Sequence, residues 1–386
     1  MRGGHALMSV ARGEEKVEQF STADNNGRIQ LVPSGNKCTL NLQRKSDGLL
    51  LDSYELPVGI RTVSWNSDQF FINNSPFYFR GFGKHEDYPI RGKGLDWPYI
   101  IKDFNLLHWV GANSFRTSHY PYSEEIVQTA DRYGIVIIDE VPAVALRYFH
   151  ASVLDVHKQM VAELIQRDKN NPSVVMWSLG NECKTAINES QPYFRELATL
   201  TREMDPTRAV TIVTNQDFDK DVVVPDMDLV CVNRYYGWYI QAGHTELIQS
   251  GVIDEYTKWR SRFKKPIIVA EYGAGAVAGM HAGPGVAFTE EYQIEVFKEH
   301  FKAFKHLRNQ GFFAGEMIWN FADFMTQQEV NRVFGNRKGI FTRDRQPKSS
   351  AFVVQSHYLQ LALELDKHLK DSPSAIEQRN WCLLEP

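Results

Sequence analysis

The chain has 386 residues, of which 43% are hydrophobic and 23% charged, so it is long enough for two or three ordinary domains or for one large barrel with an additional segment. Its 43 Lys and Arg against 47 Asp and Glu give a net charge of −4, which argues against a dedicated nucleic-acid binder. Apolar runs such as Ile135–Ile138 have the length of strands, whereas a membrane helix needs about 18–20 apolar residues. We therefore expect a soluble globular protein with no nucleic-acid and no membrane partner.

The first 62 residues differ in pattern from the rest of the chain. Residues 1–36 are polar with little periodicity and are expected to form a poorly ordered segment. Two alternating runs flank Ser46-Asp47-Gly48 and predict a β-hairpin within residues 37–62. Because two strands are not independently stable, we interpret the hairpin as the remnant of a β-sandwich. At the other end of the chain, residues 371–386 are expected to be a frayed tail.

Residues 63–370 alternate short apolar runs with amphipathic stretches. The strand candidates are Phe77–Phe82, Asn113–Ser118, Ile135–Asp139, Val174–Leu179, Ala209–Thr214, Leu229–Asn233, Ile267–Glu271 and Gly315–Trp319. Helical spacing lies between most of them, as in Val153–Arg167, Gln191–Met204, Thr245–Phe263 and Glu290–Arg308. Eight strands alternating with helices over about 240 residues predict an α/β fold, a (β/α)8 TIM barrel. A doubly wound sheet is the rival, but no Gly-x-Gly-x-x-Gly turn follows the first strand.

Two glutamates follow apolar strands at the barrel end where chemistry is expected. The fourth strand candidate leads into Asn181-Glu182, and the seventh ends at Glu271. Such a pair suits glycoside hydrolysis, in which one carboxyl protonates the leaving oxygen and the other attacks or activates water. Glu182 is the candidate acid/base and Glu271 the candidate nucleophile, with Arg116 at the end of the second strand as the cation that keeps Glu271 ionised. Each glutamate taken alone is more often a solvated loop residue or an ion-pair partner, and it is the two together that favour catalysis.

Several motifs, in this order along the chain, carry a family resemblance. They are Arg80–Asp87, Arg116–Pro121, Asn181-Glu182, Asn233–Tyr239, Glu271–Gly273 and Trp319–Phe324. From about Lys37 to about Leu365 the chain resembles the β-glucuronidases of the second glycoside hydrolase family, a retaining group whose nucleophile and acid lie on strands seven and four. The resemblance implies that Asn181 binds the sugar hydroxyl beside the reacting carbon and that Tyr235 hydrogen-bonds the nucleophile. It also implies a sugar subsite lined by His85, Asn233, Tyr239 and Trp319.

The tract from Arg332 to Gly339 bears on the choice of sugar. Asn336 offers an amide and Lys338 an ammonium, and their i, i+2 spacing lets both point to one side of an extended loop. This pair resembles the carboxylate-recognition motif of β-glucuronidases, and Arg332 is counted with the substrate-binding candidates. The alternative is a solvated basic loop, since Arg337 and other arginines lie nearby.

The leading hypothesis is a retaining β-glucuronidase that removes terminal β-D-glucuronic acid from glucuronides or glycosaminoglycan ends, with no metal and no organic cofactor. One alternative is a catalytically silent, truncated barrel that binds sugar or partner chains without turnover. Another is a β-galactosidase-type enzyme, which would depend on metal and prefer neutral sugars; Lys338 argues against it.

The resemblance also implies domains that this sequence lacks. Family members carry a jelly-roll domain and a complete immunoglobulin-like sandwich before the barrel, so we expect a truncated chain and leave a family-like homo-oligomer open. No apolar stretch typical of a signal peptide occurs in the first 30 residues. Animal relatives are lysosomal and bacterial ones cytoplasmic, so the expected location is lysosomal for an animal chain and cytoplasmic otherwise.

Overall fold

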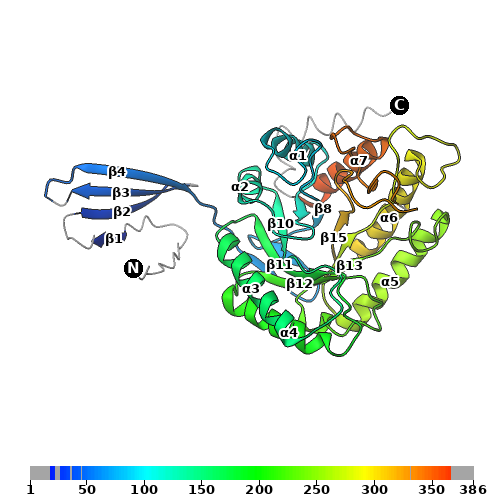
Figure 1. The fold of residues 1–386 in the computed structure, drawn as a ribbon, viewed down its shortest axis with the longest axis horizontal. Coiled ribbons are helices and arrows are strands. Elements are labelled where there is room, and N and C mark those ends of the chain that lie inside the picture. Colours follow the sequence, from blue (N-terminus) through cyan, green and yellow to red (C-terminus); the bar gives the residue numbers. More distant parts are fainter. Residues whose placement is uncertain (1–17, 22–26, 35–36, 45, 331, 367–386) are drawn as a thin grey trace. The chain divides into compact units, whose positions relative to one another are not determined.

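The computed structural model describes residues 18–21, 27–34, 37–44, 46–330 and 332–366 (Figure 1). The chain divides into two compact units, Met1–Arg61 and Thr62–Pro386. The tail expected at residues 371–386 lies outside the described residues, as do residues 367–370 at the predicted end of the barrel.

The first unit contains a four-stranded antiparallel sheet in the order β1-β2-β3-β4. Strands β3 (Lys37–Arg44) and β4 (Leu50–Pro57) pair where the sequence predicts a hairpin. The expectation of an irregular segment is wrong for β1 (Glu18–Ser21) and β2 (Gly27–Ser34), while the rest of residues 1–36 lies outside the described part. In β2 the order Arg-Ile-Gln-Leu has the period of two that a strand requires, but Gly and Asn residues before it obscure that signal. The sheet fits part of an immunoglobulin-like sandwich.

The second unit is a closed barrel of eight parallel strands, which confirms the predicted TIM barrel. The strands are β8 (Phe79–Gly83), β9 (Ser114–Arg116), β10 (Val136–Glu140), β11 (Val174–Asn181), β12 (Ala209–Thr214), β13 (Val230–Asn233), β14 (Ile267–Glu271) and β15 (Phe313–Ile318). Each overlaps one of the predicted runs, and β15 closes the ring by pairing with β8. Strand residues are buried on both faces, as in β11, where all eight are buried.

Helices surround the strands (Figure 1). They are α1 (Trp97–Trp109), α2 (Glu124–Tyr133), α3 (Ala151–Asp168), α4 (Ser190–Met204), α5 (Ile248–Phe263), α6 (Glu290–Asn309) and α7 (Ser349–Leu365). The helix predicted from Thr245 begins with a 3-10 turn, η2 (Thr245–Leu247), and only the short η1 (Val224–Asp226) separates β12 from β13. Along β14, Ile267 and Val269 pack with the helices while Ile268 and Ala270 belong to a second cluster with Ile138 and Cys231, so successive residues serve two cores.

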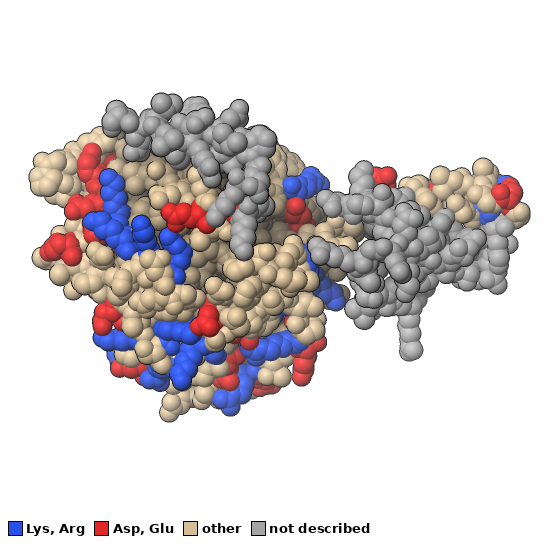
Figure 2. All heavy atoms as spheres, turned by 180° about the vertical axis from the view of Figure 1, so that it is seen from behind, with Lys and Arg blue, Asp and Glu red and all other residues tan. Residues whose placement is uncertain are grey.

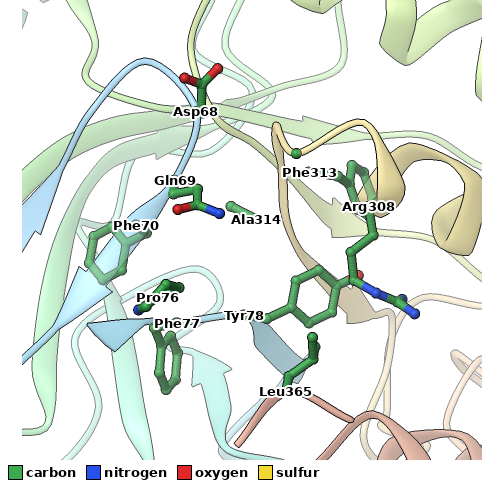
Figure 3. A pocket seen from close by; sticks show the side chains of 11 residues that line it. Asp68, Gln69, Phe70, Pro76, Phe77, Tyr78, Arg308, Phe313, Ala314 and Leu365 are labelled. Carbon is green, nitrogen blue, oxygen red and sulfur yellow. The ribbon is translucent and has the colours of Figure 1, made fainter. Parts of the chain in front are cut away.

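A small three-stranded sheet precedes the barrel, and it was not predicted from the sequence. It consists of β5 (Val63–Trp65), β6 (Phe70–Ile72) and β7 (Ser75–Pro76). Beside it lies a pocket of about 110 Å³ lined by residues that include Phe70, Tyr78, Arg308 and Phe313 (Figure 3). Tyr78 directly precedes β8 and Phe313 is the first residue of β15, so this pocket lies at the amino-terminal end of the barrel, opposite the two candidate glutamates.

On the coloured part of the face in Figure 2, Lys and Arg side chains lie among Asp and Glu side chains, and neither sign forms one continuous field. In the described ranges, no helix is both long and apolar enough to cross a membrane. The same residues contain no cluster of three or more His, Cys, Asp or Glu arranged to hold a metal ion.

Candidate active site

The two candidate glutamates both lie at the carboxyl-terminal mouth of the barrel. Glu271 is the last residue of β14, the seventh barrel strand, and Glu182 directly follows β11, the fourth. The backbone of Asn233, which ends β13, pairs with Glu271, and the Glu182 N–H donates to the Val213 carbonyl of β12. The barrel thus places both carboxyl groups on rigid strand ends.

The backbone around Glu182 is shaped to turn its side chain away from the regular strand. The register between β11 and β12 shifts between Ser178 and Asn181, and Glu182 itself has a left-handed φ of 52°. Gly180 precedes this turn at φ 152°, and a Cβ there would lie 2.8 Å from the Ala143 carbonyl oxygen. A left-handed backbone at a non-glycine residue costs about 1–3 kcal/mol and is typical of functional positions.

Glu271 is held by two donors. Arg116 Nη2 donates to Glu271 Oε1 at 2.5 Å, and Tyr235 Oη donates to Glu271 Oε2 at 2.5 Å. Burial, followed by the charge of Glu271, raises the pKa of Tyr235 well above its ordinary value, so the phenol keeps the proton that it donates. Both carboxylate oxygens of the 4%-exposed Glu271 therefore carry a strong hydrogen bond.

Glu182 has a different environment. It accepts one hydrogen bond, 2.9 Å long, from Asn233 Nδ2. Burial and then the negative charge of Glu271 raise the pKa of Glu182, because both disfavour a second carboxylate in the same mouth. The pair therefore consists of Glu271, whose two oxygens each accept a hydrogen bond, and Glu182, which retains its proton to a higher pH than an ordinary glutamate.

Two asparagines connect the glutamates. Asn181 Oδ1 accepts from Asn233 Nδ2 at 3.1 Å and from Arg116 Nη1 at 3.4 Å. With its carbonyl oxygen occupied in this way, the amide nitrogen of Asn181 is the atom that remains to donate to a bound hydroxyl.

Lys338 and Asn336 lie on a loop that is fixed from several sides. Lys338 Nζ donates to Tyr239 Oη at 2.8 Å and lies 4.7–5.3 Å from the ring centres of Tyr235, Trp238 and Tyr239. Among the described residues, it forms no ion pair with an acidic side chain, and burial lowers its pKa. Asn336 Oδ1 accepts from the Lys338 backbone N–H at 3.0 Å. The solvated basic loop is wrong for these two residues, because each is only 3% exposed.

Buried contacts behind this loop keep it in place. Asp323 Oδ1 accepts from the Gly339 N–H at 3.0 Å and from Lys348 Nζ at 2.8 Å. A Cβ at residue 339 would come within 2.2 Å of the Asp323 backbone nitrogen, so only glycine fits there. Arg332, at the start of the tract, donates to Thr326 Oγ1 at 3.4 Å while its buried Nε has no partner in the described part of the chain.

Aromatic rings form another part of the mouth. His85 lies 5.3 Å from Trp319, centre to centre, and its Nδ1 is 3.2 Å from Tyr120 Oη. The Trp319 ring stacks on His119 at 5.1 Å with an interplanar angle of 11°. Tyr239, which contacts Lys338, remains 47% exposed. Contacts among the described residues therefore connect the predicted site residues at the mouth of the barrel, except Arg332, whose side chain donates to Thr326 and which precedes Asn336 and Lys338 on the same loop.

Glu140 and His119 are not among the site residues predicted from the sequence. Glu140 ends β10, the third strand, one residue beyond an apolar run that is followed by Asp139, so a signal similar to the one at Glu271 is present there. Its side chain contacts Arg116 Nη1 at 2.8 and 2.9 Å and His119 Nδ1 at 2.8 Å. The mouth therefore holds a third carboxyl group.

A parallel barrel with two carboxyl groups at the carboxyl-terminal ends of its fourth and seventh strands is typical of glycoside hydrolases. Residues 63–363 match the glycosyl hydrolases family 2, TIM barrel domain, and the chain belongs to that family.

Among the curated proteins, the chain is 49% identical over 341 residues to the β-glucuronidase of Canis lupus familiaris, covering 85% of this chain and 52% of the relative. It is 49% identical over 320 residues to the β-glucuronidase of Homo sapiens, covering 82% of this chain and 49% of that protein. The chain thus spans about half the length of the curated relatives it matches.

The chain is also similar to solved structures of β-glucuronidases. The chain is 40% identical to Bifidobacterium dentium β-glucuronidase complexed with coumarin-3-O-glucuronide, with a TM-score of 0.78 and coverage of 86% of this chain and 54% of that one. The β-D-glucuronidase of Dictyoglomus thermophilum is also 40% identical, with a TM-score of 0.77 and coverage of 89% and 67%.

Proposed function

We propose that this chain hydrolyses β-D-glucuronides with retention of configuration at the anomeric carbon. The observation that carries the proposal is the unequal environment of the two glutamates. Glu271 accepts a charged and a neutral hydrogen bond, whereas burial and the neighbouring anion raise the pKa of Glu182. One group suits a nucleophile and the other a general acid.

In the first step, a Glu271 oxygen bonds to the anomeric carbon while the bond from that carbon to the leaving oxygen breaks. Glu182 gives its proton to that leaving oxygen, and the sugar remains attached to Glu271 as an ester. In the second step, Glu182 takes a proton from water, the water oxygen attacks the same carbon, and the ester bond breaks to regenerate both glutamates. Tyr235 and Arg116 hold Glu271 in position in both steps.

The substrate class follows from Lys338. A buried ammonium without an acidic partner among the described residues is costly unless it meets an anion, and the carboxylate of glucuronic acid supplies one. Asn336 and Arg332 add donors on the same loop, and Asn181 is assigned to the hydroxyl beside the anomeric carbon. His85, Asn233, Tyr239 and Trp319 are assigned to the walls of the sugar subsite, where rings suit the C–H faces of a pyranose. The relatives are named β-glucuronidases, which fits this substrate class. The proposal covers both small glucuronide conjugates and glycosaminoglycan ends as substrates.

The direct test is turnover of a fluorogenic β-D-glucuronide by the purified chain. The expected result is hydrolysis by the wild type, with the β-anomer of glucuronic acid appearing first in a proton NMR time course. Glu271→Gln is the matched control, because it keeps the shape and removes the attacking oxyanion. A folded wild-type chain that binds a glucuronide without turning it over would instead identify a silent binding barrel.

A further inference from the structure

The carboxyl group of Glu140 is built into the mouth of the barrel but has no part in the steps above. It is 0% exposed and accepts two hydrogen bonds from Arg116 Nη1, at 2.9 and 2.8 Å. Ser178 Oγ donates to it at 2.8 Å, and Thr117 Oγ1 accepts at 2.8 Å from the Glu140 backbone N–H. Burial opposes the charge of Glu140, but Arg116 and the hydrogen bonds from His119 and Ser178 outweigh it and hold its pKa below the ordinary value.

Arg116 is shared between two carboxylates. Its Nη1 faces Glu140 and its Nη2 faces Glu271, so one fully buried positive charge is divided between two negative ones. His119 forms a second link, since its Nδ1 lies 2.8 Å from Glu140 Oε1 and its Nε2 lies 3.9 Å from Glu271 Oε1. The stacking of His119 on Trp319 keeps this link in one orientation.

This sharing matters because the charge of Glu271 changes during the proposed reaction. As a free carboxylate, Glu271 must donate electrons to the anomeric carbon, and a cation devoted to it alone would stabilise the reactant and slow attack. As an ester it carries no charge, and Arg116 would then be a buried cation without a carboxylate. Glu140 acts in both states. Before attack it shares the positive charge of Arg116 with Glu271, and after the ester has formed it remains the counter-ion of Arg116.

We propose that Glu140 is a positioning residue that acts through Arg116 and His119 to set the balance between formation and breakdown of the glycosyl ester on Glu271. The inference rests on the proposed function. The proposal predicts opposite effects on ester formation and ester hydrolysis, whereas a purely structural role would affect both steps alike. Without the charge of Glu140, the whole charge of Arg116 falls on Glu271, which disfavours loss of the carboxylate on ester formation and favours its return on hydrolysis.

The test separates the two steps in Glu140→Gln, which keeps the shape and removes the charge. Ester formation is measured as the kcat/KM of p-nitrophenyl β-D-glucuronide, and we expect a loss of about 10- to 100-fold. Ester breakdown is measured as the reactivation rate of enzyme trapped with 2-deoxy-2-fluoro-β-D-glucuronyl fluoride, and we expect it to be unchanged or faster. Glu140→Asp, which restores the charge at shorter reach, should recover part of the loss in ester formation.

Equal slowing of both steps, or no change in either, would overturn the inference. Ser178→Ala removes one hydrogen bond to Glu140 and retains its charge, so Glu140 interacts more strongly with Arg116. We therefore expect the opposite asymmetry at smaller size, with ester formation unchanged or faster and ester breakdown slower. That variant decides the matter if Glu140→Gln does not fold, because a symmetric effect there would also contradict the proposal. A folded wild type without glucuronidase turnover would instead contradict the proposed function, and the inference would fall with it.

Discussion

Replacing Lys338 by Met tests whether this loop recognises the acid group of the sugar. The substitution removes the ammonium but keeps an unbranched apolar stem of similar length against the rings of Tyr235, Trp238 and Tyr239. The packing of the loop through Asp323 and Lys348 does not involve the Lys338 ammonium, so the fold should be preserved.

The magnitude follows from the contacts of Lys338. Its one hydrogen bond to a side chain, to Tyr239, goes to a half-exposed phenol that water also reaches, so the loss inside the protein is small. The loss toward a glucuronide is one charge-assisted hydrogen bond in a buried site, about 1.5–3 kcal/mol, or about 10- to 150-fold in kcat/KM. A β-glucoside carries a hydroxymethyl group in place of the carboxylate and should lose almost nothing.

The assay compares p-nitrophenyl β-D-glucuronide with p-nitrophenyl β-D-glucoside, and the ratio of the two kcat/KM values is the measured quantity. Lys258→Met is the matched control, because Lys258 also lies over an aromatic ring, that of Phe218, but on an exposed helix surface. Asn336→Ala should lower the ratio by less, because it removes a neutral donor. If Lys338→Met lowers activity on both sugars equally, the loop supports the fold and does not read the acid.

Three further predictions concern the glutamates and the barrel. Glu271→Gln should abolish turnover of every β-glucuronide, whereas Glu182→Ala should keep activity on substrates with good leaving groups and be accelerated by azide; identical responses would mean that the roles are misassigned. The two carboxyl groups should lie about 5–5.5 Å apart in a crystal structure, and a separation beyond about 8 Å would contradict retention. Burial and the neighbouring Asp168 carboxyl raise the pKa of Asp139 well above its ordinary value, so between the unfolded and the folded pKa the folded chain holds a proton that the unfolded chain has lost. That contribution to stability is present below the unfolded pKa of about 3.9 and is lost as the pH rises through the folded value. Asp139→Asn should therefore raise the free energy of unfolding by about 1–3 kcal/mol at pH 7, a shift of several degrees in Tm, with no gain at pH 4; equal gains at both pH values would refute this.

The sequence predicts the barrel well because its strands are buried on both faces. Runs such as Val174–Leu179 and Ile267–Glu271 are nearly continuous in apolar residues, which is the pattern of parallel strands covered on both faces. The strands Val63–Trp65 and Phe70–Ile72 are only three residues long, too short for a periodic signal. Their pairing depends on contacts with the barrel end, where Phe70 packs in the same cluster as Phe79.

For the site, the sequence identifies the residue types and the strand ends at which they lie, but it does not show that two carboxylates share one arginine. The sequence predicts Glu182 and Glu271 because each lies at the end of a predicted barrel strand. The family resemblance predicts most of the other site residues. Glu140 also follows a predicted barrel strand, yet only the distances show that Arg116 contacts Glu140 and Glu271 together. Such sharing depends on side-chain directions across neighbouring strands, which no spacing along one strand encodes.

Counting only carboxylates, Arg and Lys, the charges at the mouth balance in a way that connects Glu140, Lys338 and the proposed cycle. With Glu182 protonated, the cations Arg116 and Lys338 face the anions Glu140 and Glu271, and a bound glucuronide adds one negative charge beside Lys338. Ester formation removes the charge of Glu271 and creates one on Glu182, so the total does not change. The charge of Glu271 is also one cause of the raised pKa of Glu182, and its loss lowers that pKa after the proton has left. In the proposed cycle Arg116 keeps Glu140 at every step, and from substrate binding to product release Lys338 faces the substrate carboxylate, so in the occupied site each buried cation has an anion.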